Sequence, residues 1–179
     1  PDLLPPILGY RVEGVREEAG QVQVETLMEL EPGLDHVMGL VPARAEGIWV
    51  SQEESEGWRV LLDQSALRPL YPEEEGAAEA VGHWVRARQG CGEGRQHPAG
   101  LLGVPSLADQ LCGSQGEPRL GQVGQVEQLE AAPFLAAFGP EFQQWARVVP
   151  VAAPVPLRAV VAPIGDGWTV IGVLAAEQP

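Results

Sequence analysis

The sequence contains no lysine and no asparagine, and all eleven of its cationic side chains are arginines. Aspartate and glutamate number 25, which gives a formal net charge of −14 at pH 7 with an acidic excess in both halves of the chain. Nucleic-acid phosphates and anionic lipid headgroups are bound by clusters of cations, which this composition does not supply. The charge therefore argues against a nucleic-acid or anionic-membrane partner and is interpreted as a solubility feature.

Long hydrophobic runs are also absent. No stretch approaches the roughly 18–20 apolar residues that a membrane-spanning helix needs, so we expect no span within this chain. The chain begins at Pro1 rather than at a methionine, in a proline-rich segment. We interpret this start as a processed N-terminus, with a signal peptide or membrane anchor upstream.

Cysteine is scarce, with only Cys91 and Cys112 in the chain. Such a pair can form a disulfide, remain as two buried thiols, or supply half of a metal site. A metal site needs further ligands, and no C-x-x-C or H-x-x-x-H spacing is present. We expect the disulfide, which implies an oxidising compartment and hence an extracellular or cell-surface location.

No catalytic, cofactor-binding or metal-binding constellation is apparent in the sequence. His36, His83 and His97 have no nucleophile or acid at a spacing that indicates a triad. The glycines at 90–94 follow an expected helix rather than a strand and lack the context of a dinucleotide or phosphate loop. Three carboxylates could serve as a base in a buried site: Asp109, Glu127 and Glu130. We expect each of them to lie at the surface instead. We therefore expect a protein without enzymatic activity, cofactor or metal.

The sequence pattern of the first half of the chain predicts strands and turns. Alternation of apolar and polar residues predicts strands at 8–16, 22–30, 48–52 and 58–64. A sheet with one apolar face needs a covering layer, and no helix is predicted here to supply it. The residues that most need cover are the apolar row on the second strand: Val22, Val24, Met28 and Leu30.

The second half mixes helices with strands. A helix is expected over 72–90, then a glycine-rich loop over 91–104 and a short helix from Ser106, opened by a capping box with Asp109. Strands are expected at 121–130, 142–151, 157–162 and 168–175, with a helical turn at 133–138 and prolines only at strand ends or sheet edges. The fold class is therefore α+β, with curved antiparallel sheets and few helices, in two domains at 1–71 and 72–179.

Three tryptophans of the second half could line an apolar pocket for a small ligand: Trp84, Trp145 and Trp168. The competing interpretation, which we favour, is that they fill the core between helix and sheet. Trp168 also belongs to an internal similarity. The Gly-Trp hairpin at 46–63 resembles the one at 156–173, which predicts two related sheets with Trp58 and Trp168 in equivalent positions.

The order helix, short helix, strand and three long antiparallel strands ending in Asp166-Gly167-Trp168-Thr169-Val170 resembles the NTF2-like (cystatin-like, SnoaL-like) superfamily. The resemblance covers residues 72–175 and implies a curved sheet wrapped round a helix to form a cone. Residues 8–64 would then be the sheet half of a second copy. Tandem copies of this kind look similar to secreted bacterial lipoproteins and to components of conjugation machines. No family site residues can be carried over, because no specific family motif is present.

The leading hypothesis is a secreted or surface-anchored interaction or assembly module that works through a protein partner. The alternative is a small-molecule-binding protein or cofactor-free enzyme that uses the cone of residues 72–175. A third, weaker hypothesis is a subunit of a conjugation or secretion apparatus.

Overall fold

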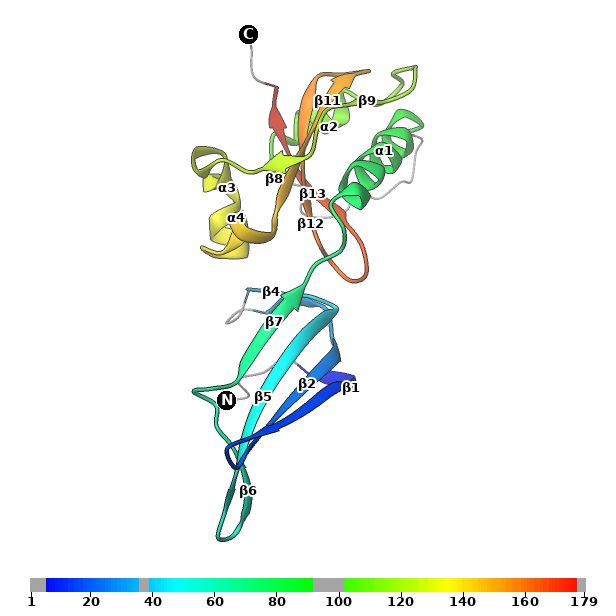
Figure 1. The fold of residues 1–179 in the computed structure, drawn as a ribbon. Helices are drawn as coiled ribbons and strands as arrows, with labels where there is room; N and C mark the ends of the chain where they lie inside the picture. Colours follow the sequence, from blue (N-terminus) through cyan, green and yellow to red (C-terminus); the bar gives the residue numbers. More distant parts are fainter. Residues whose placement is uncertain (1–5, 36–38, 92–101, 177–179) are drawn as a thin grey trace. The chain divides into compact units, whose positions relative to one another are not determined.

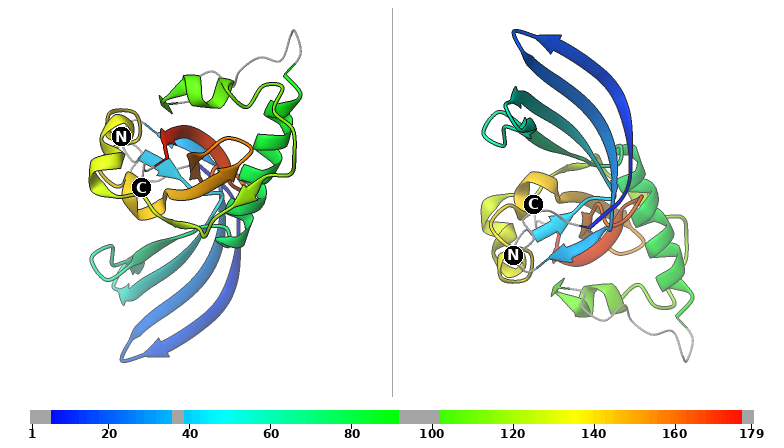
Figure 2. Two further views of the ribbon diagram at one scale, coloured as in Figure 1. Left: turned by 90° about the horizontal axis from the view of Figure 1, so that it is seen from above. Right: turned by 90° about the horizontal axis from the view of Figure 1, so that it is seen from below.

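The computed structural model describes residues 6–35, 39–91 and 102–176 (Figure 1). The chain divides into two compact units, Pro1–Tyr71 and Pro72–Pro179. The expected α+β class is confirmed, with open antiparallel sheets and few helices. In the first unit, β1, β2 and β5 curve together as one sheet (Figure 2).

The described part of the first unit consists of strands. Its elements are β1 (Ile7–Glu18), β2 (Gln21–Leu30), β3 (Gly33–Asp35), β4 (Gly39–Val41), β5 (Arg44–Glu54), β6 (Gly57–Val60) and β7 (Ala66–Leu70). The main sheet has the order β1-β2-β5-β6, β7 also pairs with β5, and β3 pairs with β4 as a separate hairpin. Ala19 and Gly20 join β1 to β2 with positive φ angles of 51° and 80°, which suits the twist of a tight hairpin.

The predicted strand over 58–64 is wrong beyond Val60, because the chain turns away from the sheet there. Ser65 fixes this turn: its hydroxyl donates to the Leu61 carbonyl at 2.8 Å and accepts the Val50 N–H at 3.1 Å. Strand β7 then follows, which the sequence did not predict because Pro69 weakens the strand pattern.

The hydrophobic core of the first unit lies at one end of its sheet. It consists of four buried residues: Met28, Leu30, Val41 and Ala45. Trp49 and Leu67 pack against them. The Trp49 indole N–H donates to the Thr26 hydroxyl at 2.8 Å, and that hydroxyl lies 3.4 Å from the Gly47 carbonyl oxygen. A Cβ on Gly47 would lie 2.5 Å from the Trp49 indole nitrogen, so the ring can pack there only over a glycine.

We expect Gly47→Ala to lower the free energy of unfolding by about 2 kcal/mol, because the added methyl group displaces Trp49 and breaks its hydrogen bond. Urea denaturation followed by tryptophan fluorescence measures the change. Gly33→Ala is the matched control, since a Cβ there meets nothing within 4 Å. Equal stability of the two variants would contradict this account of Trp49.

The second unit mixes short helices with one sheet. Its elements are α1 (Glu75–Gln89), β8 (Leu102–Gly103), α2 (Pro105–Asp109), β9 (Arg119–Leu120), β10 (Gly124–Gln125), α3 (Gln128–Phe138), α4 (Phe142–Trp145), β11 (Arg147–Ala153), β12 (Leu157–Ala162) and β13 (Thr169–Ala175). The sheet order is β10-β11-β12-β13-β8, with β9 also on β11 and only the β13–β8 pair parallel. No helix of the described residues is long and apolar enough to cross a membrane.

Two strands predicted in this unit are partly helical. The predicted strand over 121–130 is wrong except at Gly124–Gln125, which form β10. From residue 128 the chain forms α3, after a capping box in which the Glu127 N–H donates to the Glu130 carboxylate at 3.2 Å. Residues 142–145 form α4, so the predicted strand over 142–151 begins only at Arg147. The expected capping box at Ser106 is also wrong, because Val104 is the N-cap and Pro105 opens α2.

Pro150 lies inside β11, where its missing N–H is tolerated for a reason visible in the pairing. The Pro150 carbonyl accepts the Gly121 N–H at 2.8 Å. Because N and O of one strand residue point to the same side, the missing donor faces the short edge strands β9 and β10, which do not pair at this position. The sheet therefore loses no ladder hydrogen bond to β12.

The core of the second unit has two parts. Helix α1 packs on β11, β12 and β13 and buries Ala77, Val81 and Val85. Around α3 and α4 lies an aromatic cluster in which Phe134 stacks on Phe142 with ring centroids 5.1 Å apart. The expected helix over 72–90 and the expected meander over 157–175 are confirmed by α1, β12 and β13.

Candidate interaction surface

Cys91 and Cys112 form a disulfide, with their Cα atoms 5.2 Å apart. The bond joins the segments that follow α1 and α2, and it confirms the expected pairing over free thiols or half of a metal site. His36, His97 and the glycine-rich residues 92–101 lie outside the described residues. His83 is exposed on α1. In the described part of the chain, no group of three or more His, Cys, Asp or Glu residues could hold a metal ion.

The three candidate carboxylates of the second unit have structural partners. Glu130 pairs with Arg158 through two contacts, one of 2.9 Å, with 18% and 14% of the two side chains exposed. Glu127 caps α3. Asp109 lies 4.0 Å from the Arg88 guanidinium. Each carboxylate therefore stabilises a helix or a packing contact.

The three candidate pocket tryptophans lie in two parts of the core. Trp84 and Trp168 pack against the cluster under α1, and the Trp168 indole N–H donates to the Glu73 carbonyl at 2.9 Å. Trp145 is only 3% exposed and packs edge-on against Phe142. This arrangement favours the core interpretation of all three.

The two Gly-Trp hairpins share a strand register, but their tryptophans differ in exposure. Trp58 lies within β6, opposite Glu53, and is 57% exposed. Trp168 comes immediately before β13 and is half-buried. In the first hairpin Ser51 pairs with Val60 and Gln52 with Arg59, and in the second Val161 pairs with Val170 and Ala162 with Thr169. A shift of 110 positions (161 − 51) superimposes these pairs, so the register agrees with equivalent positions for Trp58 and Trp168. The two hairpins differ in how far the ladder continues toward the turn: it includes Trp58 in the first hairpin and ends before Trp168 in the second.

The main sheet of the first unit has two faces of opposite character. Residues that pair across antiparallel strands point to the same face, so the register fixes each set. We call the first set the apolar face; from β1, β2, β5 and β6 it includes Tyr10, Val12, Val15, Val22, Val24, Thr26, Met28, Ala45, Trp49, Trp58 and Val60. The second set, the polar face, includes Arg11, Arg16, Gln23, Glu25, Glu46, Gln52, Glu54, Arg59 and Arg68, with four apolar residues among them: Leu27, Ile48, Val50 and Leu70.

Only one end of the apolar face is covered. Met28 and Leu30 are each 3% exposed in the core, whereas Val22 and Val24 farther along β2 are half-buried. The edges of the face are open, with these exposed fractions: Tyr10 73%, Val12 49%, Val15 62%, Trp58 57% and Val60 45%. The β2 row is therefore covered at Met28 and Leu30, as predicted, but Val22 and Val24 at the other end of the sheet are only half-buried.

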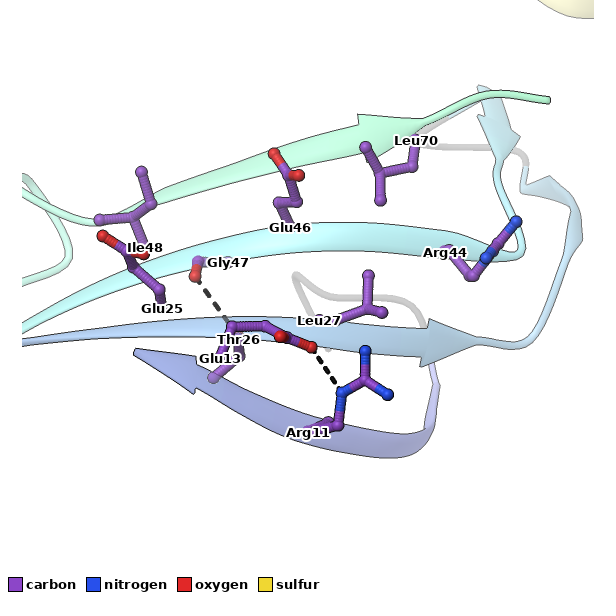
Figure 3. Close-up of a pocket in the computed structure, with 10 residues that line it drawn as sticks. All are labelled: Arg11, Glu13, Glu25, Thr26, Leu27, Arg44, Glu46, Gly47, Ile48 and Leu70. Atoms are coloured by element: carbon purple, nitrogen blue, oxygen red, sulfur yellow. Dashed lines mark hydrogen bonds and ion pairs between the residues drawn. The ribbon is translucent and has the colours of Figure 1, made fainter. Parts of the chain in front are cut away.

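The polar face contains an open hollow of about 600 Å³, shown in Figure 3. Its charged lining residues are Arg11, Glu13, Glu25, Arg44 and Glu46, and apolar side chains from three strands complete it. The carboxylates are already paired: Glu13 with Arg11 at 2.5 Å, Glu25 with Arg16 at 3.3 Å and Glu46 with Arg68 at 3.8 Å. The first pair lies within β1 and the other two cross between strands. Ion pairs on such exposed side chains indicate a solvated face rather than a site prepared for a charged ligand.

A second apolar surface lies on α3. Leu129 is 90% exposed, and four further residues at helical spacing are also exposed: Ala132, Pro133, Ala136 and Ala137. A helix that is apolar on both sides is usually buried on both. Because this face is narrow and made mostly of small side chains, the broader apolar face of the first unit is the stronger candidate.

Sequence reasoning identified only the β2 row of the apolar face. The contributions of β1 were missed because its alternation is interrupted by register shifts between Ile7 and Gly9 and between Val12 and Gly14. Trp58 and Val60 were noticed only as part of a hairpin. Pairing them with the β2 row requires the β2–β5–β6 register, which no single strand contains.

Comparisons with protein-family models, with curated proteins and with solved structures found no match to this chain.

Proposed function

We propose that this chain is a non-enzymatic interaction or assembly module that binds a protein partner through the apolar face of its first unit. The observation that carries the proposal is the contrast between the two faces of one sheet. The polar face is crossed by ion pairs and suits water, whereas the other presents Tyr10, Val15 and Trp58 to solvent. A sheet of this kind is normally covered on its apolar side.

The extent of the exposed surface supports binding rather than chance exposure. Aromatic side chains present about 150–250 Å² each and the five open residues together roughly 600 Å², which is at the upper end for the largest patch on a monomer. Such patches mark interaction sites.

The site of action that we propose is outside the cell. The Cys91–Cys112 disulfide supports it, because stable disulfides form in oxidising compartments. For the second unit we propose an NTF2-like scaffold, supported by α1 packed on the antiparallel β11–β13 meander. The small-molecule alternative within residues 72–175 has less support, because Trp84 and Trp168 pack against the core.

The test is a triple variant, Tyr10→Thr with Val15→Thr and Val60→Thr, compared with wild type by urea denaturation and by fluorescence of the neutral apolar dye Nile red. We expect the variant to lose most of the dye emission while its free energy of unfolding changes by no more than about 1 kcal/mol. The control is Gln52→Thr, on the polar face of β5.

Two outcomes would contradict the proposal. Dye emission that the triple variant leaves unchanged would place the apolar surface elsewhere. A loss of stability above about 3 kcal/mol would show that these side chains belong to a buried core.

A further inference from the structure

We propose that the partner on the apolar face is a second copy of this chain, and that two such faces pack against each other across a two-fold axis. This inference rests on the proposed function, because it names the occupant of the same surface. An isologous contact of this kind needs only one surface per molecule. It also closes on itself, so it forms a dimer and does not continue into a filament.

Charge favours this face as the place where two copies meet. Each chain carries a formal charge of −14, so contact through most of its surface brings acidic groups together. On the apolar face, the strand pairings place only Glu17 and Glu53 among apolar and hydroxyl-bearing residues. Glu17 pairs with Val22 near the β1–β2 turn, and Glu53 pairs with Trp58 near the β5–β6 turn. Both acids therefore lie at the turn end of the face, beside Trp58 and Val60, whereas the part of the face around Tyr10, Val12 and Val15 contains no acid.

The available area fits a dimer of modest affinity. A standard interface buries about 800 Å² on each partner. The five exposed side chains present roughly 600 Å², and the half-buried Val22, Val24 and Trp49 extend the same surface. The area of the face therefore predicts a dimer with a micromolar Kd, which dissociates into monomers on dilution.

The shape of the contact follows from how sheets pack. Two sheets pack face to face about 10 Å apart, with inward side chains interdigitating. Here Val60 from β6 lies at one side of the face and Val15 from β1 at the other, at neighbouring levels of the sheet, whereas Tyr10 lies farther along β1, level with Met28. A two-fold axis parallel to β2 and β5 would bring Val15 of one copy against Val60 of the other. The polar faces of both sheets then remain in water.

The experiment is sedimentation velocity of the full-length chain over a hundredfold range of concentration. We expect the mass to rise from 19.1 kDa to twice that value. Val15→Glu and Val60→Glu, measured separately, should each weaken the association at least tenfold, because each places like charges in the contact. Gln52→Glu adds the same charge on the polar face and should leave the association unchanged.

A chain that stays monomeric at every concentration would overturn the inference. It would also be overturned by a dimer that persists in Val15→Glu and Val60→Glu but is lost in Leu129→Glu, which would place the contact on α3. If the chain is monomeric, Nile red binding distinguishes failure of the second-copy inference from failure of the proposed function. If substitutions on the apolar face lower the dye emission, only the second-copy inference fails. If they leave the emission unchanged, the proposed function fails as well.

Discussion

Phe134→Ala is expected to lower the free energy of unfolding by about 3–5 kcal/mol, because it empties the centre of the aromatic cluster in the second unit. Phe134 is fully buried and stacks on Phe142. Its ring lies directly over Gly172 of β13, where a Cβ would come within 2.4 Å of the ring. The cavity left by alanine is therefore bounded by a sheet and a second helix, which limits how far it can collapse.

The matched control is Leu129→Ala on the same helix, where the side chain is 90% exposed. We expect that substitution to change stability by less than about 0.5 kcal/mol. Guanidinium denaturation of both variants provides the comparison. A loss below about 1 kcal/mol for Phe134→Ala would mean that α3 does not pack on β13 as described.

Removing the disulfide is expected to lower the free energy of unfolding by about 3 kcal/mol, because the unfolded chain regains the freedom of the closed loop. Cys91 and Cys112 are separated by 21 positions, so the effect is that of a loop of moderate length. The measurement compares thermal unfolding of wild type with and without reductant, and of the double variant Cys91→Ala and Cys112→Ala.

The double variant is also the internal control, since reductant should not change its melting temperature. Wild-type protein that unfolds identically with and without reductant would contradict the bond. Mass spectrometry of the oxidised protein should show the loss of two hydrogen atoms relative to the reduced chain, and two freely alkylated thiols would remove the support for an extracellular location.

Strands with clear alternation or clear boundaries could be predicted from the sequence. In β2, valine, threonine and methionine alternate with glutamine and glutamate, with Leu27 as the exception, and β12 and β13 are bounded by proline and glycine turns. Helix α3 could not be predicted in the same way. It follows residues that alternate like a strand, it contains Pro133, and its capping box uses Glu127 in place of the usual serine or threonine.

The candidate site was predictable only in part, because it is a property of register. The β2 row and the disulfide follow from residue types and spacing. The open edges of the apolar face depend on which residue of β1 pairs with Val24 and which residue of β6 pairs with Ser51. Those pairings are set by bulges and turns, and one strand read alone does not contain them.

The most direct test of the central claim is the reactivity of a single engineered thiol on the apolar face, measured in the oxidised full-length chain at a concentration where it is monomeric. We predict that Val60→Cys reacts with a maleimide at a rate within about tenfold of Gln52→Cys on the polar face, because both positions are open to solvent. Protection of Val60→Cys by a hundredfold or more in the monomer, with Gln52→Cys still reactive, would show that the apolar face is covered within the chain and would contradict its role as a binding surface.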